Sequence, residues 1–234
     1  MWVLATAAAG IVIAAMAAWT GPSWLVPLIA ARAPGCLYAV RTRERVVALT
    51  IDDGPDPAAT PAILRALHEH GAGATFFLIS TRVADQATLV DTIVAAGHEI
   101  GNHLTRDEPS IRLSPESFDA AVRDAGTVLR RFAPVRWLRP GSGWYTPAMI
   151  STIERAGYRC ALGSIYPFDA HLPSPAFASA YILANVRPGA VIVLHDGGAR
   201  GRRTVTTLQR VLPVLRARGY RVVPLSELCD QAAM

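Results

Sequence analysis

The 234-residue sequence predicts an α/β fold, in which a mainly parallel β-sheet is covered by helices. The first observation is that apolar runs of strand length alternate about seven times with segments of helical periodicity. The second is that 51% of the residues are hydrophobic, which suits a folded core and argues against disorder. The length allows one single-core domain or two small ones, and the alternation allows a closed barrel or an open doubly wound sheet.

The expected strands are short runs rich in β-branched, leucine and aromatic residues. They cover residues 45–51, 74–79, 98–103, 135–140, 158–164, 190–196 and 220–228. The expected helices begin at signals such as Thr60-Pro61, and several end at a glycine. They cover residues 60–71, 87–97, 114–132, 146–157, 174–186 and 204–219, the last with a possible kink at Pro213.

The N-terminal segment, residues 1–31, contains no charged side chain. It is long enough to cross a bilayer, which takes roughly 20 apolar residues. It lacks the basic start of a cleaved signal peptide, so we expect a hydrophobic helix that serves as a membrane anchor or uncleaved signal. A buried helix of the folded domain is the alternative. We expect residues 32–44 to form a linker and residues 45–230 to form the main domain.

The distribution of arginine argues against a nucleic-acid-binding protein, and the spacing of the cysteines shows no zinc or redox motif. All 23 basic residues are arginine, the net charge is +5, and the densest run is Arg200-Gly201-Arg202-Arg203. A nucleic-acid-binding protein would concentrate arginines with aromatic residues on one face, so we expect no nucleic acid partner. The three cysteines form no Cys-x-x-Cys pattern, and we expect buried free thiols, although one pair could bridge in an exported domain. They are Cys36, Cys160 and Cys229.

Ionisable residues follow directly after most of the apolar strands. Because the carboxyl ends of parallel barrel strands share one rim, these residues are expected to converge. Each residue alone has a structural explanation: the Asp-Asp-Gly-Pro stretch is an ordinary turn, and a histidine and an aspartate four residues apart can belong to a polar loop. The convergence therefore indicates a site. Its members are Asp52, Asp53, His103, Asp107, Arg139, Asp169, His195 and Asp196.

Five ordered stretches at these strand ends resemble the motifs of the polysaccharide deacetylase family, the NodB-homology domain of carbohydrate esterase family 4. The resemblance spans about residues 44–228 and implies a distorted (β/α) barrel of about seven strands, which here follows the hydrophobic helix. The stretches are Thr50-Ile51-Asp52-Asp53-Gly54-Pro55, Gly101-Asn102-His103-Leu104-Thr105-Arg106-Asp107, Arg139-Pro140-Gly141-Ser142-Gly143, Tyr166-Pro167-Phe168-Asp169 and Ile192-Val193-Leu194-His195-Asp196.

The resemblance implies a metal-dependent hydrolase that removes N-acetyl groups from an amino-sugar oligo- or polysaccharide. In this catalytic domain, one divalent metal ion would bind to Asp53, His103 and Asp107. Asp107 stands where most members of the family have a second histidine. The resulting Asp-His-Asp set is richer in oxygen, so the ion is expected to be zinc or else manganese, iron or cobalt. Glu108 is an alternative ligand, although it lies one residue outside the four-residue spacing.

The resemblance also implies the acid–base pair. Asp52 would be the general base, with Arg139 keeping its carboxylate ionised and oriented. His195 would be the general acid that protonates the leaving amine, oriented by Asp169. The family usually has a tryptophan after this second aspartate, and this sequence does not.

The remaining substrate contacts depart further from the family pattern. Gly141 and Ser142 replace Pro-Tyr, which leaves a more open groove, and a backbone N–H near Ser142 would complete the oxyanion site. Trp144 and Tyr145 follow at once and would either stack against a sugar or pack in the core. Leu194 is expected to line the substrate site beside the general acid.

Two other functions compete with the deacetylase. One is a catalytically silent, membrane-tethered carbohydrate-binding domain, against which the retention of a base, an orienting arginine and an acid argues. The other is a related amidase that acts on a non-sugar amide. We expect a monomer that acts on an N-acetylated glycan and is attached to the membrane through its N-terminal helix. We expect the catalytic domain outside the cytoplasm, although arginines after the apolar segment would favour the opposite orientation.

Overall fold

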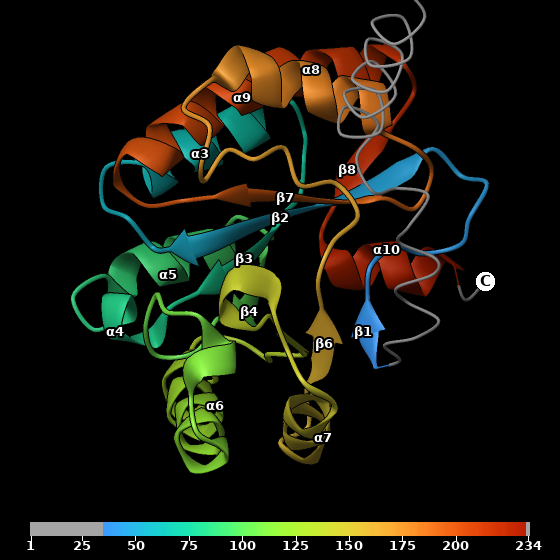
Figure 1. The fold of residues 1–234 in the computed structure, drawn as a ribbon. Helices are drawn as coiled ribbons and strands as arrows, with labels where there is room; N and C mark the ends of the chain where they lie inside the picture. Colours follow the sequence, from blue (N-terminus) through green and yellow to red (C-terminus); the bar gives the residue numbers. More distant parts are fainter. Residues whose placement is uncertain (1–34, 233–234) are drawn as a thin grey trace, which may run out of the picture.

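The computed structural model describes residues 35–232, in which eight strands form one parallel sheet (Figure 1). Their order is β1-β6-β5-β4-β3-β2-β7, β8 pairs with β2, and every ladder is parallel. The α/β class with a parallel sheet is confirmed. The strands are β1 (Cys36–Leu37), β2 (Val46–Gly54), β3 (Thr75–Leu78), β4 (Glu99–Asn102), β5 (Trp137–Leu138), β6 (Arg159–Ala161), β7 (Val191–His195) and β8 (Arg221–Val223).

The segment after β6 draws the sheet towards a closed barrel. Ile165 forms a parallel bridge with Ile192 of β7. The N–H of Ile165 donates to the Val191 carbonyl at 3.1 Å, and the Val193 N–H donates back to the Ile165 carbonyl at 3.0 Å. Because β6 and β7 lie far apart along the strand order, this bridge joins two distant parts of the sheet. The closure is a single bridge rather than a full ladder, so the barrel is irregular.

Helices cover the outside of the sheet, and most begin where the sequence predicts. Prolines open α6, α7 and α8, and the preceding Ser114, Thr146 and Ser174 each accept a hydrogen bond from a backbone N–H of the first turn. The helices are α3 (Thr60–Glu69), α4 (Ser80–Val83), α5 (Ala87–Ala95), α6 (Pro115–Leu129), α7 (Pro147–Arg155), α8 (Pro175–Asn185), α9 (Gly198–Ala217) and α10 (Leu225–Ala232), with 3₁₀ turns η2 (Ser110–Arg112) and η3 (Gly141–Gly143).

Three expectations need correction or fall outside the described residues. The strand predicted over 220–228 ends at Val223, because Pro224 lacks the N–H that would continue the ladder and α10 follows it. The predicted linker contains β1, which pairs with β6, so the packed domain begins before residue 45. The N-terminal helix predicted for residues 1–31 lies outside the described residues. Among residues 35–232, no helix combines the length and apolar character needed to span a membrane.

The prediction of free cysteines is wrong for two of the three residues. Cys36 of β1 and Cys160 of β6 form a disulfide, whereas Cys229 of α10 is a free thiol. Parallel pairing places Cys36 directly opposite Cys160 in the ladder, which brings their side chains together. This partner could not be deduced from the sequence, because a two-residue strand gives almost no periodic signal.

Candidate active site

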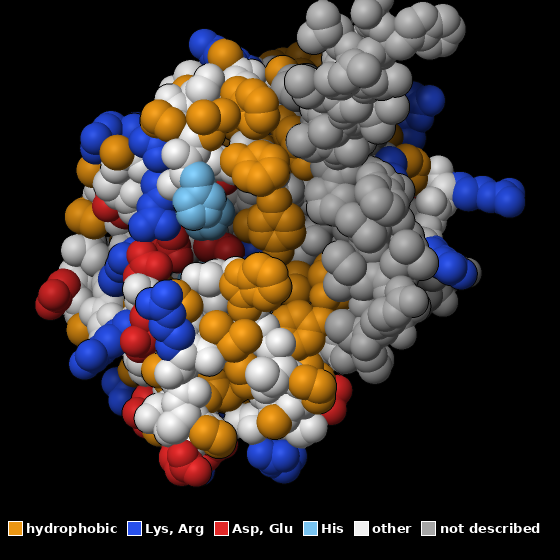
Figure 2. Space-filling model, in the orientation of Figure 1, with side chains coloured by type: hydrophobic (Ala, Val, Ile, Leu, Met, Phe, Trp, Pro, Cys, Tyr) orange, Lys and Arg blue, Asp and Glu red, His pale blue; other side chains and the backbone are white. Residues whose placement is uncertain are grey.

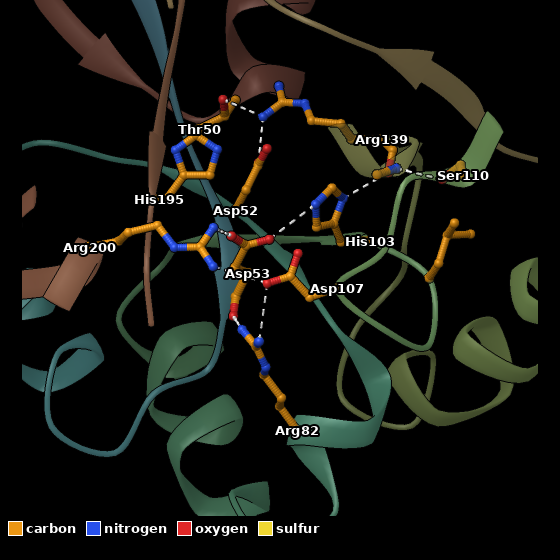
Figure 3. Close-up of polar contacts among 12 residues, drawn as sticks. Thr50, Asp52, Asp53, Arg82, His103, Asp107, Ser110, Arg139, His195 and Arg200 are labelled. Carbon is orange, nitrogen blue, oxygen red and sulfur yellow. Dashed lines mark hydrogen bonds and ion pairs between the residues drawn. The ribbon is translucent and has the colours of Figure 1, made fainter. Parts of the chain in front are cut away.

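The carboxyl ends of neighbouring strands bring most of the predicted site residues together (Figure 3). β2 and β7 pair in register, so that Asp52 stands opposite His195. β4 delivers His103 from its end, and β5 delivers Arg139. The parallel sheet therefore accounts for a cluster whose members are far apart in the sequence.

Asp52 and Arg139 form a buried ion pair. The Nη1 of Arg139 lies 2.5 Å from Asp52 Oδ1, and the two side chains are 1% and 6% exposed. The same guanidinium donates to Thr50 Oγ1 at 2.9 Å and to the carbonyls of Ala161 and Leu162 at 3.1 and 2.7 Å. These contacts fix the guanidinium and satisfy a charge that would be costly to bury alone. Arg139 is therefore placed to orient the Asp52 carboxylate.

His195 and Asp169 form a second pair. The Nδ1 of His195 donates to the two carboxylate oxygens of Asp169, each at 3.1 Å, and the His195 N–H donates to Asp169 Oδ2 at 3.0 Å. Burial opposes a charge on the imidazole, but the hydrogen bond and the negative charge of Asp169 raise the pKa of His195 to about 9. Nε2 is left free to act on a substrate. Asp169 matches its family motif less closely than the other site residues match theirs, because no tryptophan follows it. Its carboxylate nevertheless accepts the hydrogen bond from the His195 imidazole.

Asp53 and His103 face each other beside these pairs. His103 Nδ1 donates to the Arg139 carbonyl at 2.7 Å, and its Nε2 lies 3.4 Å from Asp53 Oδ1. Burial opposes a charge on His103, but the charges of Asp52 and Asp53 raise its pKa. Burial would raise the pKa of Asp53, but the hydrogen bond and charge of His103, followed by the charges of His195 and Arg200, lower it to about 2.

Asp107 contacts two arginines. Its Oδ2 lies 3.0 Å from Arg200 Nη2 and 3.4 Å from Arg82 Nη2. The other arm of the Arg200 guanidinium, Nη1, lies 2.7 Å from Asp53 Oδ2, so one guanidinium bridges both carboxylates. Arg82 also donates to the backbone carbonyl of Asp53. With the side chains in these positions, no three carboxylate, histidine or cysteine side chains among the described residues are close enough together to hold one metal ion.

The donor set nevertheless fits a divalent metal ion. A ligating histidine usually donates its second ring N–H to a carbonyl or carboxylate, and His103 makes this contact with Arg139. Its Nε2 and the Asp53 carboxylate are buried and point towards each other. Asp53 and Asp107 both reach the same guanidinium, so their oxygens are within reach of a common cation. Asp53, His103 and Asp107 are therefore the residues that could hold the ion.

The loops that carry the site have uncommon backbone conformations. The described non-glycine residues with positive φ lie at the end of a strand or in the segment that follows one, and they are Asp53, Leu104, Ser142 and Phe168. Such conformations cost about 1–3 kcal/mol each and persist where surrounding contacts fix them. The Asn102 side chain supplies one such contact, because its Oδ1 accepts from the Leu104 N–H at 2.8 Å. This contact holds the chain directly after His103.

The predicted substrate contacts divide into exposed and buried residues. Trp144 is 68% exposed, whereas the Tyr145 hydroxyl contacts the Tyr38 hydroxyl at 2.6 Å and its ring packs against the core. Leu194 is 1% exposed and belongs to the core cluster. Ser142 lies in η3 and is exposed. The face shown in Figure 2 gathers acidic, basic and histidine side chains beside a band of hydrophobic ones.

Sequence reasoning missed the two arginines that contact the predicted metal ligands. Arg200 was visible only as part of the densest basic run, and Arg82 had no signal at all. Asp196 was seen at the end of a strand but given no role. Its buried carboxylate accepts hydrogen bonds from Thr60 Oγ1 and from the Gly197 N–H, so it joins the end of β7 to the start of α3.

Sequence comparison gives one family. A family model described as polysaccharide deacetylase matches residues 39–161, more than half of the chain. A peptidoglycan-N-acetylglucosamine deacetylase of Bacillus cereus is 34% identical over 194 residues, which cover 82% of this chain and 91% of the relative. A chitooligosaccharide deacetylase of Bradyrhizobium sp. is 34% identical over 217 residues, which cover 87% of this chain and 98% of the relative.

Solved structures give the same picture. A peptidoglycan N-acetylglucosamine deacetylase bound to an N-hydroxybenzamide compound matches with a TM-score of 0.79 at 26% identity, over 86% of this chain and 95% of the other. A family 4 acetyl xylan esterase from Clostridium thermocellum in complex with a cobalt ion matches with a TM-score of 0.74 at 30% identity. The match covers 80% of this chain and 91% of the esterase. A mutant of a CE4 family pseudoenzyme with restored activity matches with 0.76 at 25% identity, over 84% and 71%.

Proposed function

Because the chain belongs to the polysaccharide deacetylase family, we propose that it is a metal-dependent hydrolase that removes N-acetyl groups from an amino-sugar oligo- or polysaccharide. One observation carries this proposal. A carboxylate locked by an arginine and an imidazole held by a carboxylate stand at paired positions of adjacent strands. The relatives named as peptidoglycan and chitooligosaccharide deacetylases support an N-acetylglucosamine-containing substrate.

Asp53, His103 and Asp107 are the proposed metal ligands, and the cobalt-containing relative supports such a site. The ion would be zinc or, given two carboxylates, manganese, iron or cobalt. When bound, it supplies Lewis-acid polarisation of the acetamide carbonyl. His103 is prepared for this role because its Nδ1–H is committed to the Arg139 carbonyl and the ring is held in place.

Asp52 is the proposed general base. Arg139 binds Oδ1 and holds the carboxylate in place, so Asp52 is positioned to accept a proton from the attacking water. The resulting hydroxyl forms a bond to the acetamide carbon. A backbone N–H near Ser142 is proposed to stabilise the negative oxygen that develops there.

His195 is the proposed general acid. Asp169 holds Nδ1 and keeps the imidazole protonated, so Nε2 can give its proton to the sugar nitrogen as the carbon–nitrogen bond breaks. The products are acetate and the free amino sugar. Trp144 is the exposed residue proposed to stack against a neighbouring sugar ring.

We also propose that residues 1–31 anchor the catalytic domain to the outer face of a membrane and that the protein acts as a monomer. The Cys36–Cys160 disulfide supports an extracytoplasmic location, since disulfides persist mainly in oxidising compartments. Attaching a reporter that is active on only one side of the membrane to the C-terminus tests the orientation. A reporter that is active only in the cytoplasm would contradict the proposed location.

Acetate release from a panel of N-acetylated oligosaccharides tests the proposed function. The protein is first treated with a chelator and then supplied with zinc, manganese, iron or cobalt. We expect release only after a metal is added, and none from the Asp52→Asn variant. A protein that binds the oligosaccharides without releasing acetate under any of these conditions would instead be a silent binding domain, a possibility raised by the pseudoenzyme with a similar fold.

A further inference from the structure

Arg200 binds to the two carboxylates proposed as metal ligands. Its guanidinium lies 2.7 Å from Asp53 Oδ2 and 3.0 Å from Asp107 Oδ2, one nitrogen on each residue (Figure 3). The mechanism proposed above gives this arginine no task. An arginine bridging two carboxylates satisfies them with both charge and fork geometry, as a bound cation would.

The Asp53 and Asp107 carboxylates have several side-chain partners, and His103 Nε2 lies 3.4 Å from Asp53 Oδ1. The two carboxylates face two guanidinium groups, those of Arg82 and Arg200. Arg82 also donates to the Asp53 backbone, so it belongs to the framework of the loop. Arg200 makes both of its ion pairs with carboxylate side chains. A divalent ion between these carboxylates would therefore add two positive charges directly beside the Arg200 guanidinium.

The position of Arg200 in α9 is also unusual. It lies in the first turn of the helix, which contains no acidic residue, and Arg202 and Arg203 follow in the next turn. The helix dipole disfavours cations at this end, so the contacts with Asp53 and Asp107 offset an unfavourable placement. A Cβ on Gly201 would meet Ala59 Cβ at 2.3 Å, so α9 approaches α3 closely at this glycine. This close approach fixes the backbone that carries Arg200.

We infer that Arg200 is a tethered counter-cation: it neutralises Asp53 and Asp107 in the metal-free enzyme and leaves them when a divalent ion binds. The inference rests on the proposed function, because it takes these residues as metal ligands. The side chain is one-third exposed, at 33%, and its flexible stem allows the guanidinium to turn towards solvent. Arg200 therefore lowers the metal affinity of the site and stabilises the metal-free protein.

Calorimetric titration of cobalt or zinc into the chelator-treated full-length protein tests this. Arg200→Gln is expected to bind the metal about tenfold more tightly, because the competing charge is gone. Arg202→Gln is the matched control: it removes the same charge two residues further along the same helix, at an exposed residue. Its affinity is expected to stay within about twofold of wild type, since exposed charges interact weakly.

Thermal unfolding supplies a readout that does not depend on catalysis. Without metal, Arg200→Gln is expected to melt at a lower temperature than wild type, because two carboxylates lose a partner. Saturating metal should then raise its melting temperature by more than it raises that of wild type. Arg202→Gln should behave as wild type in both conditions.

Metal affinity in Arg200→Gln that is equal to or weaker than in wild type would overturn the inference. If the wild-type protein bound no divalent ion at all, the metal dependence of the proposed function would fail first. In that event, a metal-free melting temperature of Arg200→Gln equal to that of wild type would also refute the stabilising role of Arg200. The failure of the inference is thus distinguishable from the failure of the proposed function.

Discussion

Asp52 is a buried carboxylate whose ion pair with Arg139 fixes its direction. Asp52→Asn keeps the shape but removes the basic oxygen. We expect the turnover number for acetate release to fall roughly 100- to 10,000-fold, the usual contribution of a general base. Metal content, measured by elemental analysis, should stay at the wild-type level because Asp52 is not a proposed ligand. Wild-type turnover in a well-folded variant would show that Asp52 is not the base.

Asp169 raises the pKa of His195, and in the proposed mechanism it thereby sets the alkaline limit of activity. A general acid must be protonated, so activity is lost as pH rises through its pKa, which is about 9 for His195. Asp169→Asn removes the negative charge that raises this pKa. We expect the alkaline limb of kcat/KM to move to lower pH, towards the ordinary value for histidine of about 6.5. The measurement is a pH profile of acetate release.

An unchanged alkaline limb, with only a lower maximum, would mean that Asp169 positions His195 without setting its charge. His171→Asn is a suitable control, because this exposed histidine lies two residues away in the same loop. That substitution should leave the pH profile as it is.

The clustering of Asp52, Arg139 and His195 could be predicted from the sequence because these residues stand at the ends of apolar strands or directly after them. A parallel sheet brings such ends together regardless of loop detail. The arginine contacts of Asp107 could not be predicted in this way. They depend on where a helix turn and a loop come to lie, and no periodicity encodes this. The position of Asp169 was harder to predict than those of the strand-end residues. Asp169 lies in a loop between β6 and α8, next to Phe168 with its positive φ, and no helix or strand positions it.

Elements were predictable wherever the period of apolar residues and a start or stop residue agreed. The helices opened by Ser-Pro or Thr-Pro begin where predicted because the proline and the capping oxygen act locally. The C-terminal segment was mistaken for one long strand because Val-Val-Pro-Leu reads as a continuous apolar run. The tertiary structure instead ends β8 before Pro224 and packs α10 against the sheet.

Asp196 links β7, α3 and α9, and its ionisation is expected to tune stability. Burial, opposed in part by the hydrogen bond from Thr60, raises the pKa of Asp196 from 3.8 to about 6. A raised carboxyl pKa stabilises the fold fully below the unfolded value, and this contribution is lost as pH rises through the folded value. The asparagine side chain in Asp196→Asn is uncharged at every pH, so it makes no such pH-dependent contribution. Relative to wild type, its free energy of unfolding should gain about 2 kcal/mol between pH 4 and pH 6.5 and then level off.

Guanidinium unfolding of both proteins at several pH values measures this difference. Asn can still accept from the Gly197 N–H and can also contact Thr60, so the variant should fold. The quantity that tests the prediction is the change with pH in the difference between the two free energies of unfolding. The size of that difference at a single pH does not test it. A difference that does not change between pH 4 and pH 6.5 would show that Asp196 does not titrate in the folded protein over this range.

At the scale of the whole molecule, one property of the sheet explains the site. Every ladder in the described chain is parallel, so each strand ends at the same rim and each following loop can contribute a side chain. β1 also pairs in parallel, at the edge of the sheet beside β6, and the Cys36–Cys160 disulfide fixes it there. The disulfide thereby joins the first described strand to β6, 124 residues further along the chain.

The Cys36–Cys160 disulfide is expected to contribute to stability through the long chain segment that it closes. The two residues are 124 positions apart, and a cross-link over a long loop restricts the unfolded chain most. Cys36→Ser should therefore lower the free energy of unfolding by about 2–4 kcal/mol. Cys229→Ser, which removes the free thiol of α10, is the control and should have a free energy of unfolding close to that of wild type.

Guanidinium unfolding with and without reductant measures both effects. Reductant should lower the free energy of unfolding of the wild-type protein to that of Cys36→Ser and should leave that variant unchanged. A wild-type protein that unfolds at the same guanidinium concentration after its disulfide has been fully reduced would refute this contribution.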